Sequence, residues 1–215
     1  MHLLLTDRLF CPRCGPGFGL VLWADRLEER RVHGGHLGCA NCRERYPIDG
    51  GVADLRPAPR TPGMGVVTAS PSEDLDPTTA TAIAAAMGAG QGGRPVLLVG
   101  EAARWLPALV PLLPEDVDVV VAQFEPSVDA NGVHGLDRIS RVIVGDVWPF
   151  GDASFGGVTV AGPQAEPTRL RTLGRLLDPR HRLVVLDPPE GIQVRLGGAG
   201  LTRFVQAPGI AAASR

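Results

Sequence analysis

The chain has 215 residues, a formal net charge of −2 and a hydrophobic fraction of 44%. This length suits one ordinary domain plus a smaller one, and the composition is that of a globular protein, which excludes a fully disordered chain. The near-zero charge gives no overall field that would attract nucleic acid or an anionic membrane, although it leaves a local basic patch open. All 21 basic residues are arginine, so no lysine can act as a Schiff base or a general base.

The start of the chain, MHLLLTDRLF, lacks the basic region and the long apolar stretch of a secretory signal. No window approaches the roughly 18 uncharged apolar residues that a transmembrane helix needs. We therefore expect a cytoplasmic protein without a membrane partner. In that reducing compartment, clustered cysteines favour metal binding over disulfide formation.

Three segments follow one another along the chain. Residues 1–56 are rich in cysteine, glycine and arginine, with short strand-like runs at 20–23 and 31–33. Residues 57–74 carry four prolines and little apolar periodicity, so we interpret them as a linker. Residues 75–215 contain the pattern of a larger α/β domain.

The third segment begins with an alanine-rich run at 78–87, for which Asp76 and Pro77 supply a helix N-cap and the first helical position. Short apolar runs then recur about every 20 residues, which is typical of strands that alternate with helices in a parallel sheet. Because these runs are continuous rather than alternating, we expect both faces of each strand to be covered. The expected strands are 96–99, 117–122, 139–144, 158–161 and 183–186. The expected helices are 168–177 and 102–113, the latter made irregular by two prolines.

The C-terminal tail predicts a pair of closing strands, at Ile192–Leu196 and within Phe204–Ser214. Before this tail, only four residues, 188–191, lie between Asp187 and Ile192. We therefore expect no helix between the strand at 183–186 and the first closing strand.

The four cysteines of the chain form two Cys-x2-Cys pairs, Cys11 with Cys14 and Cys39 with Cys42. Each pair places two thiolates on a tight turn, and two such turns can complete a tetrahedron around zinc. The interval between the pairs leaves room for a hairpin. A closed site with four sulfur ligands has no position for water, so we expect a structural zinc ion.

Other readings of the cysteines stay open. Four incidental buried thiols or a redox-active pair would need no metal. His33 and His36 lie near the second pair and are alternative ligands, but four thiolates already satisfy a zinc ion. We expect the two histidines to be loop residues.

The run CANCRERYPIDGGVADL at 39–55 resembles the bacterial zinc-ribbon family related to the small activator subunit of tRNA, rRNA and release-factor methyltransferases. The likeness lies in the cysteine pairs followed by Tyr46-Pro47-Ile48, and it covers about the first quarter of the chain. It implies an adaptor for a protein or RNA partner and does not itself imply catalysis. No basic recognition helix follows the second pair, so we expect no DNA partner.

Several later runs resemble the class I S-adenosylmethionine-dependent methyltransferases: VLLVG ending at Gly100, QFEPS around Glu125, VGD ending at Asp146, and the segments 148–155 and 173–187. The resemblance implies an α/β fold, a Rossmann-like class I methyltransferase sheet with a small N-terminal zinc-ribbon domain. It also implies that S-adenosylmethionine is held by Gly100, by Glu125 at the ribose and by Asp146 at the adenine. Ordinary exposed acids in loops are the alternative for the two carboxylates.

The expected cofactor loop departs from the pattern of that family. The family uses several glycines there because a residue without a side chain lets the backbone approach the cofactor and adopt a positive φ. Here the loop reads GEAARW, in which only Gly100 remains and Arg104 stands in place of the last glycine. An added β-carbon at a positive-φ position costs about 1–2 kcal/mol. The later turn at 178–181, DPRH, likewise replaces the usual Pro-Gly-Gly.

Two functions remain open at this point. In the first, the chain is a pseudoenzyme that serves as a scaffold or regulator of a protein or RNA partner. In the second, it is an active methyltransferase that binds S-adenosylmethionine with an atypical loop. No catalytic residue can be assigned, and no serine elbow with a histidine partner indicates a hydrolase.

Overall fold

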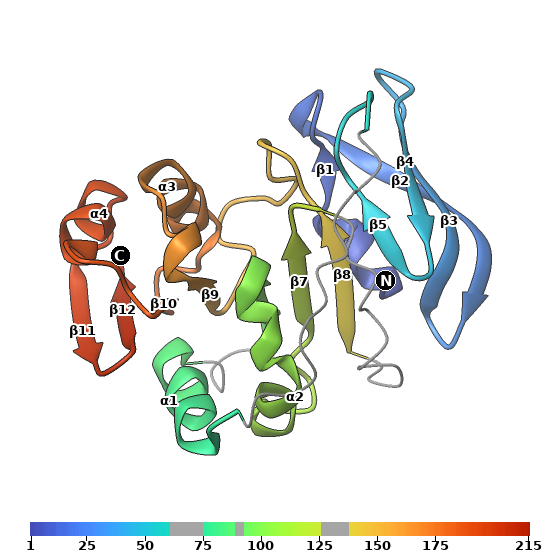
Figure 1. Cartoon of the computed structure of the whole chain (residues 1–215). Coiled ribbons are helices and arrows are strands. Elements are labelled where there is room, and N and C mark those ends of the chain that lie inside the picture. The colour runs from blue at the N-terminus through green and yellow to red at the C-terminus, as the bar shows by residue number, and fades with distance from the viewer. Residues whose placement is uncertain (61–74, 89–92, 126–137) are drawn as a thin grey trace. The chain divides into compact units, whose positions relative to one another are not determined.

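The computed structural model describes residues 1–60, 75–88, 93–125 and 138–215 (Figure 1). The predicted linker therefore lies outside the described residues from position 61 onward. By compactness the chain divides into two units. Unit 1 contains residues 1–69 and 120–151, and unit 2 contains residues 70–119 and 152–215. The domain boundaries predicted after residues 56 and 74 do not coincide with the limits of these two units, and they stay a prediction.

Unit 1 is built on strands in the order β1-β2-β3-β4-β5-β8-β7. Neighbours from β1 to β5 are antiparallel, whereas β5 lies parallel to β8, with Val52 beside Arg141 and Asp54 beside Ile143. A 3-10 helix, Leu3–Arg8, precedes β1. The bounds are β1 Phe10–Cys11, β2 Gly15–Glu28, β3 Arg31–Cys39, β4 Arg45–Asp49, β5 Val52–Asp54, β7 Val119–Gln123 and β8 Ile139–Ile143. The N-terminal ribbon thus continues through β5 into strands of the α/β part.

The interval between the cysteine pairs is a long β2–β3 hairpin, as their spacing predicts. Its turn residues, Glu29 and Arg30, have φ values of 45° and 65°, the left-handed backbone that suits the twist of a two-residue hairpin. Both strands extend well beyond the two short runs that the sequence indicates, because glycines such as those at 15, 17 and 19 give no strand signal. His33 and His36 lie in β3, so the expectation of loop residues was wrong.

Unit 2 holds strands in the order β6-β9-β10-β12-β11. Strands β6, β9 and β10 are parallel, and β12 pairs antiparallel with both β10 and β11. The bounds are β6 Val96–Val99, β9 Val158–Ala161, β10 Leu183–Leu186, β11 Arg203–Ala207 and β12 Ile210–Ser214. Every residue of the three parallel strands is buried, which confirms that both of their faces are covered.

Helix α1, Pro77–Met87, begins where the sequence predicts. The Asp76 carboxylate caps it by accepting hydrogen bonds from the backbone N–H groups of Thr78 and Thr79 at 3.1 and 3.0 Å. Gly88 ends the helix in the left-handed conformation. The helix contacts β9, β10 and β12.

The other helices of unit 2 are short. The expected irregular helix is a 3-10 turn at Gly100–Trp105, the single α-helical turn α2 at Leu106–Leu109 and a further 3-10 turn at Val110–Leu112. Helix α3 spans Pro167–Leu176, one residue from its predicted start and end. Among the helices in the described part of the chain, none is long and apolar enough to cross a membrane.

The segment expected to form the first closing strand is instead helix α4, Ile192–Gly198. Ile192, Val194 and Leu196 alternate as in a strand, but Ile192 and Leu196 are buried while Val194 is 80% exposed. That spacing of four residues is the period of a helix. The closing strands are β11 and β12, and the expectation that no helix precedes them was wrong.

Candidate functional site

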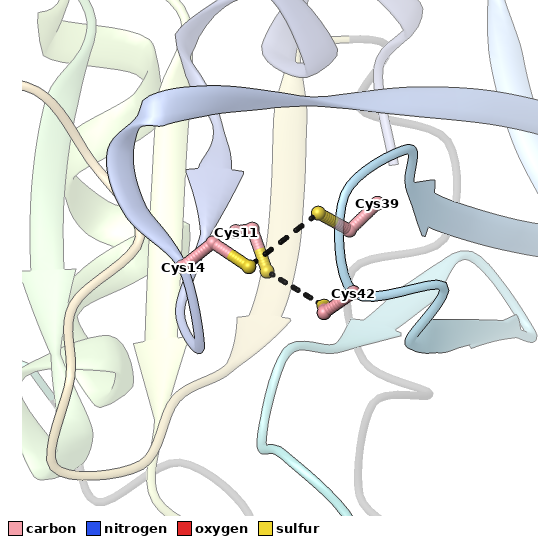
Figure 2. A group of neighbouring side chains, drawn as sticks. All are labelled: Cys11, Cys14, Cys39 and Cys42. Carbon is pink, nitrogen blue, oxygen red and sulfur yellow. Dashed lines mark hydrogen bonds between the residues drawn. The ribbon is translucent and has the colours of Figure 1, made fainter.

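The four cysteine sulfurs of unit 1 form one group in which all ligand atoms lie within 4.8 Å of one another. Sγ of Cys11 lies 3.7 Å from Sγ of Cys42, and Sγ of Cys39 lies 3.9 Å from Sγ of Cys14. Figure 2 shows that both of these contacts join one pair to the other. A regular tetrahedron with sulfur about 2.3 Å from zinc has edges of about 3.8 Å. The cysteine group therefore fits one tetrahedral metal ion.

Two tight turns bring the sulfurs together. Cys11 ends β1 and Cys39 ends β3, and each is followed by a turn that carries its partner cysteine. Gly15 closes the first turn with φ 86°, and Arg43 closes the second with φ 61°. The N–H of Arg43 donates to the carbonyl of Cys39 at 3.0 Å. The antiparallel hairpin between the turns sets their separation.

The surroundings of Cys39 favour its thiolate. Burial raises the pKa of this thiol, but hydrogen bonds from the backbone N–H groups of Cys42 and Asn41 lower it, and the resulting pKa is about 7. A thiolate is the form that binds a metal ion. The same tight turn therefore positions the ligand and stabilises its charge.

Tyr46 contacts the cysteine group and was not predicted as a site residue. Its side chain is fully buried, and its hydroxyl oxygen lies 3.4 Å from Sγ of Cys11. Burial raises the pKa of Tyr46 far above its usual value, as does the contact with Cys11. The hydroxyl thus stays protonated and can donate to the Cys11 sulfur. The available signal was that the chain contains one tyrosine, four residues after Cys42.

Glu125 and Asp146, the predicted cofactor acids, lie at one edge of unit 1. They follow β7 and β8, and both are exposed. The N–H of Val144 donates to the carbonyl of Gln123 at 2.8 Å, so the two strand ends lie side by side. Their position beyond the ends of buried strands is where open α/β sheets bind ligands.

Arg56 belongs to the same edge and was missed by the sequence interpretation. It follows β5 and pairs with Asp54, with Nη2 2.7 Å from Oδ2 and Nε 2.9 Å from Oδ1. Hydrogen bonding to Asp54 raises the pKa of Arg56, and the charge of Glu125 adds to this effect. An acid and an arginine two residues apart give no distinctive sequence signal.

Gly100, the remaining glycine of the expected cofactor loop, is covered by another side chain of unit 2. Its φ is 56°, and a Cβ built on it would lie 2.2 Å from Oε1 of Gln164. The backbone N–H of Glu101 donates to the same oxygen at 3.2 Å. Gln164 therefore occupies the space beside the bare backbone, a role that the sequence interpretation did not assign.

Arg104 also contacts its own unit. Its Nη2 lies 3.3 Å from Oδ2 of Asp187, and its cationic carbon lies 5.9 Å from the centre of the Trp105 ring. The two charged side chains are 48% and 70% exposed, so this ion pair adds little stability. Gly162 allows a close approach nearby, because a Cβ there would lie 2.0 Å from the carbonyl oxygen of Asp187.

The DPRH turn that replaces the family's Pro-Gly-Gly is a charged and partly buried structure. Asp178 is buried, and its carboxylate lies 3.0 Å from Nε of Arg94. Hydrogen bonds from the side chain and backbone of Arg180 lower the pKa of Asp178 to about 2, with a further contribution from the charge of Arg94. This turn stabilises unit 2.

The three predicted cofactor residues belong to different units. Gly100 lies in unit 2, whereas Glu125 and Asp146 lie in unit 1. Their joint action on one cofactor stays a prediction.

No family model matches the sequence, and no curated protein matches it. Solved structures do match. A SAM-dependent methyltransferase from Aquifex aeolicus is 20% identical, with a TM-score of 0.50 over 64% of this chain and 87% of its own. A chain from the complex that contains the Haloferax volcanii Trm112 methyltransferase activator is 17% identical, with a TM-score of 0.50 over 60% of this chain and 69% of its own.

A third match, the [4+2]-cyclase SpnF, is 16% identical with a TM-score of 0.49, and the chain spans 58% of its length. Likeness at these identities is a likeness of fold. The chain has a mixed α/β fold of the class I, Rossmann-like methyltransferase type. The cysteine group near its N-terminus is compatible with a small zinc domain.

Proposed function

We propose that the chain is a zinc-binding protein with a methyltransferase fold whose catalysis is weakened or lost, and that it acts as a scaffold or regulator of a protein or RNA partner. The observation that carries this proposal is the contact between Gln164 and the loop that begins at Gly100. The side chain lies where a cofactor would need open backbone, and it accepts the hydrogen bond of the Glu101 N–H at 3.2 Å.

Zinc would be held by Cys11, Cys14, Cys39 and Cys42. Sulfur separations of 3.7 and 3.9 Å support this assignment. One shared ion would also connect the two turns that carry the cysteine pairs. With four thiolates and no position for water, the ion would stabilise the ribbon rather than activate a nucleophile. A reducing cytoplasm would keep the thiols free for the metal.

Loss of cofactor affinity would follow from two features of unit 2. Displacing Gln164 costs its hydrogen bond to Glu101, and the remaining loop residues carry side chains where the family has glycine. Arg104, 3.3 Å from Asp187 in an exposed ion pair, would add little to this cost. A nucleoside would have to compete with all of these contacts.

The second candidate is an active methyltransferase that binds S-adenosylmethionine. The observation in its favour is that Glu125 and Asp146 are both exposed at adjacent strand ends. These carboxylates would accept hydrogen bonds from the ribose hydroxyls and the adenine amino group. A partner protein would then have to supply the missing cofactor contacts, or the Gln164 side chain would have to move away from Gly100.

Isothermal titration with S-adenosylmethionine and S-adenosylhomocysteine distinguishes the two candidates. For the full chain we expect no heat at millimolar ligand. Gln164→Ala removes the side chain over Gly100 and is expected to restore weak binding. The matched control is Gln193→Ala, because Gln193 is an exposed glutamine whose amide donates to another glutamine, Gln206, at 3.2 Å. Micromolar binding by the unmodified chain that disappears in Asp146→Ala would establish the enzyme and end the pseudoenzyme proposal.

Metal analysis tests the zinc assignment independently of the cofactor. We expect one zinc ion per chain after purification without chelators. Less than about half an equivalent, or retention of the metal by Cys39→Ser, would count against four-cysteine ligation.

A further inference from the structure

One face of the ribbon in unit 1 exposes a fixed aromatic pair. Trp23 of β2 is 50% exposed, and its indole stacks on the imidazole of His36 in β3, with ring centroids 5.2 Å apart and planes 6° from parallel. By contrast, the other tryptophans, Trp105 and Trp148, are 8% and 4% exposed. Val21, two residues before Trp23 on the same strand, is 48% exposed, so the two side chains together form an exposed apolar patch that a partner could cover.

Strand register defines the rest of this face. Val21 lies beside Gly38, and Gly38 lies beside Arg45 on β4. In the next row Trp23, His36 and Pro47 follow one another across the same three strands. Residues two apart on a strand share a face, so the two rows form one surface. We call it the Trp23 face, and it consists of Val21, Trp23, His36, Gly38, Arg45 and Pro47.

Gly38 makes room for the indole. A Cβ at this position would lie 2.5 Å from Cζ3 of Trp23, so the ring lies directly over the bare backbone of β3. The edge of the ring at Cζ3 therefore lies against Gly38, and one face of the ring stacks on His36. Half of the residue is exposed, so the ring is accessible to another planar group.

Positive charge flanks the aromatic pair. Arg45 is exposed in the first row, and Arg26 is exposed beyond Trp23, where it pairs with Gly34 of β3. Neither guanidinium forms an ion pair with any residue that the structure describes. Two exposed acids lie near these arginines, Asp25 two residues after Trp23 and Asp49 two residues after Pro47. The formal charges of the four side chains cancel, so Arg26 and Arg45 are the individual groups that could contact an anion.

We propose that the Trp23 face binds single-stranded RNA, with a base stacked on Trp23 and phosphates paired with Arg26 and Arg45. The inference deepens the proposed function and depends on it, because it names the partner of the scaffold. An open aromatic plane beside free guanidinium groups is the combination that holds unpaired bases and their backbone. RNA is favoured because its loops present unpaired bases.

The first test measures binding of a labelled single-stranded RNA of about ten nucleotides by fluorescence anisotropy at low salt. Trp23→Ala is expected to weaken binding by about 5- to 150-fold, the range of base stacking on an aromatic ring. Trp23→Phe keeps a smaller ring and should recover part of the affinity. Phe204→Ala is the matched control, since Phe204 is 39% exposed on β11 of unit 2, and it should have no effect.

The second test uses salt dependence, which a purely structural role would not change. Arg45→Ala and Arg26→Ala should each reduce the slope of log K against log salt by about 0.7, because each removes one phosphate contact. Arg171→Ala, an exposed arginine of α3, should leave the slope unchanged. Zinc content and circular dichroism of every variant should match those of the parent chain.

A third variant changes the position of the Trp23 indole without changing the charge of the face. Gly38→Ala adds a methyl group under the indole and should weaken RNA binding without changing the net charge or the salt slope. The proposal is overturned if the parent chain does not bind RNA at low salt, which would leave this face to a protein partner. It is also overturned if Trp23→Ala binds RNA as well as the parent. Cofactor titration is a separate measurement, so a chain that binds both RNA and S-adenosylmethionine contradicts only the loss of catalysis.

Discussion

The cysteine group of unit 1 and the loop at Gly100 of unit 2 differ in whether their polar groups already have a partner within the protein. In the first, every group that a tetrahedral ion needs is present, and sulfur separations of 3.7 and 3.9 Å match the geometry of zinc. In the second, the Glu101 N–H already has a partner in Gln164, 63 residues further along the chain. The four sulfurs of the first site could hold one ion, whereas the Glu101 N–H of the second already has its partner.

The two sites therefore differ in which of them still has groups free for a ligand. Four thiols gathered within 4.8 Å gain most from a metal ion that neutralises their thiolates. In the loop at Gly100 the Glu101 N–H is bonded to Gln164, and the same side chain covers the glycine. The described residues thus gather four possible metal ligands in unit 1, whereas in unit 2 a side chain covers Gly100.

The largest expected effect follows from loss of the metal. Cys39→Ser, or treatment with a strong chelator, should remove most of the stability of the ribbon, because zinc binding contributes about 10–16 kcal/mol in small zinc domains. Hydrogen exchange should become fast in β2, β3 and β4 while β9 and β10 of unit 2 stay protected. Equal protection of β3 with and without metal would contradict the comparison.

Adding a methyl group at the covered glycine comes next. Gly100→Ala should destabilise unit 2 by about 2–4 kcal/mol, since it combines a positive φ with a Cβ 2.2 Å from Gln164. The double variant with Gln164→Ala should recover the steric part but not the backbone part. Gly198→Ala is the control, because a Cβ there meets nothing within 4 Å. Urea unfolding measures these three variants and Gln164→Ala alone, and additivity of the two single changes would mean that Gln164 does not cover Gly100.

Acid should weaken the turn that replaces Pro-Gly-Gly. The pKa of Asp178 is lowered to about 2, so its contribution is fully present above its ordinary pKa of about 3.9 and is lost as the pH falls toward 2. Asp178→Asn should therefore cost on the order of 2 kcal/mol at neutral pH, and its deficit should shrink between pH 4 and 2. Asp152→Asn is the matched control, because that carboxylate is 70% exposed in its pair with Arg175. A deficit that does not change with pH would exclude the ionic role of Asp178.

The smallest expected effect concerns the N-cap of helix α1 in unit 2, which belongs to neither the cysteine group nor the loop at Gly100. Asp76→Ala removes the cap that accepts two backbone hydrogen bonds of α1 and should cost about 1 kcal/mol. Asp76→Asn keeps a capping oxygen and should cost less. Thermal unfolding at pH 7 measures both, and a larger loss for the asparagine variant would indicate a role other than capping.

Local patterns predicted much of this structure. The strands at 96–99, 158–161 and 183–186 have the bounds that their apolar runs indicate, because strands covered on both faces are apolar throughout. The cysteine group was also predictable, since each pair is fixed by its own turn. Helix α4 was missed because Ile192, Val194 and Leu196 alternate as in a strand although their burial follows a helical period.

The supporting residues could not be predicted, because their roles depend on contacts between distant positions. Tyr46 reaches Cys11 across 35 residues, and Gln164 reaches Glu101 across 63. No short motif records that a glutamine after β9 covers a glycine after β6. The sequence showed that Gly100 is the one glycine of the GEAARW loop, and the structure identified Gln164 as the side chain beside it.

The most direct test of the covered loop is a crystal structure of the zinc-loaded chain grown with excess S-adenosylhomocysteine. The account predicts that Gln164 stays over Gly100, that its oxygen accepts from the Glu101 N–H, and that no nucleoside density lies beside the loop. Density for an adenosyl group against Glu101, with the Gln164 side chain turned away, would contradict it.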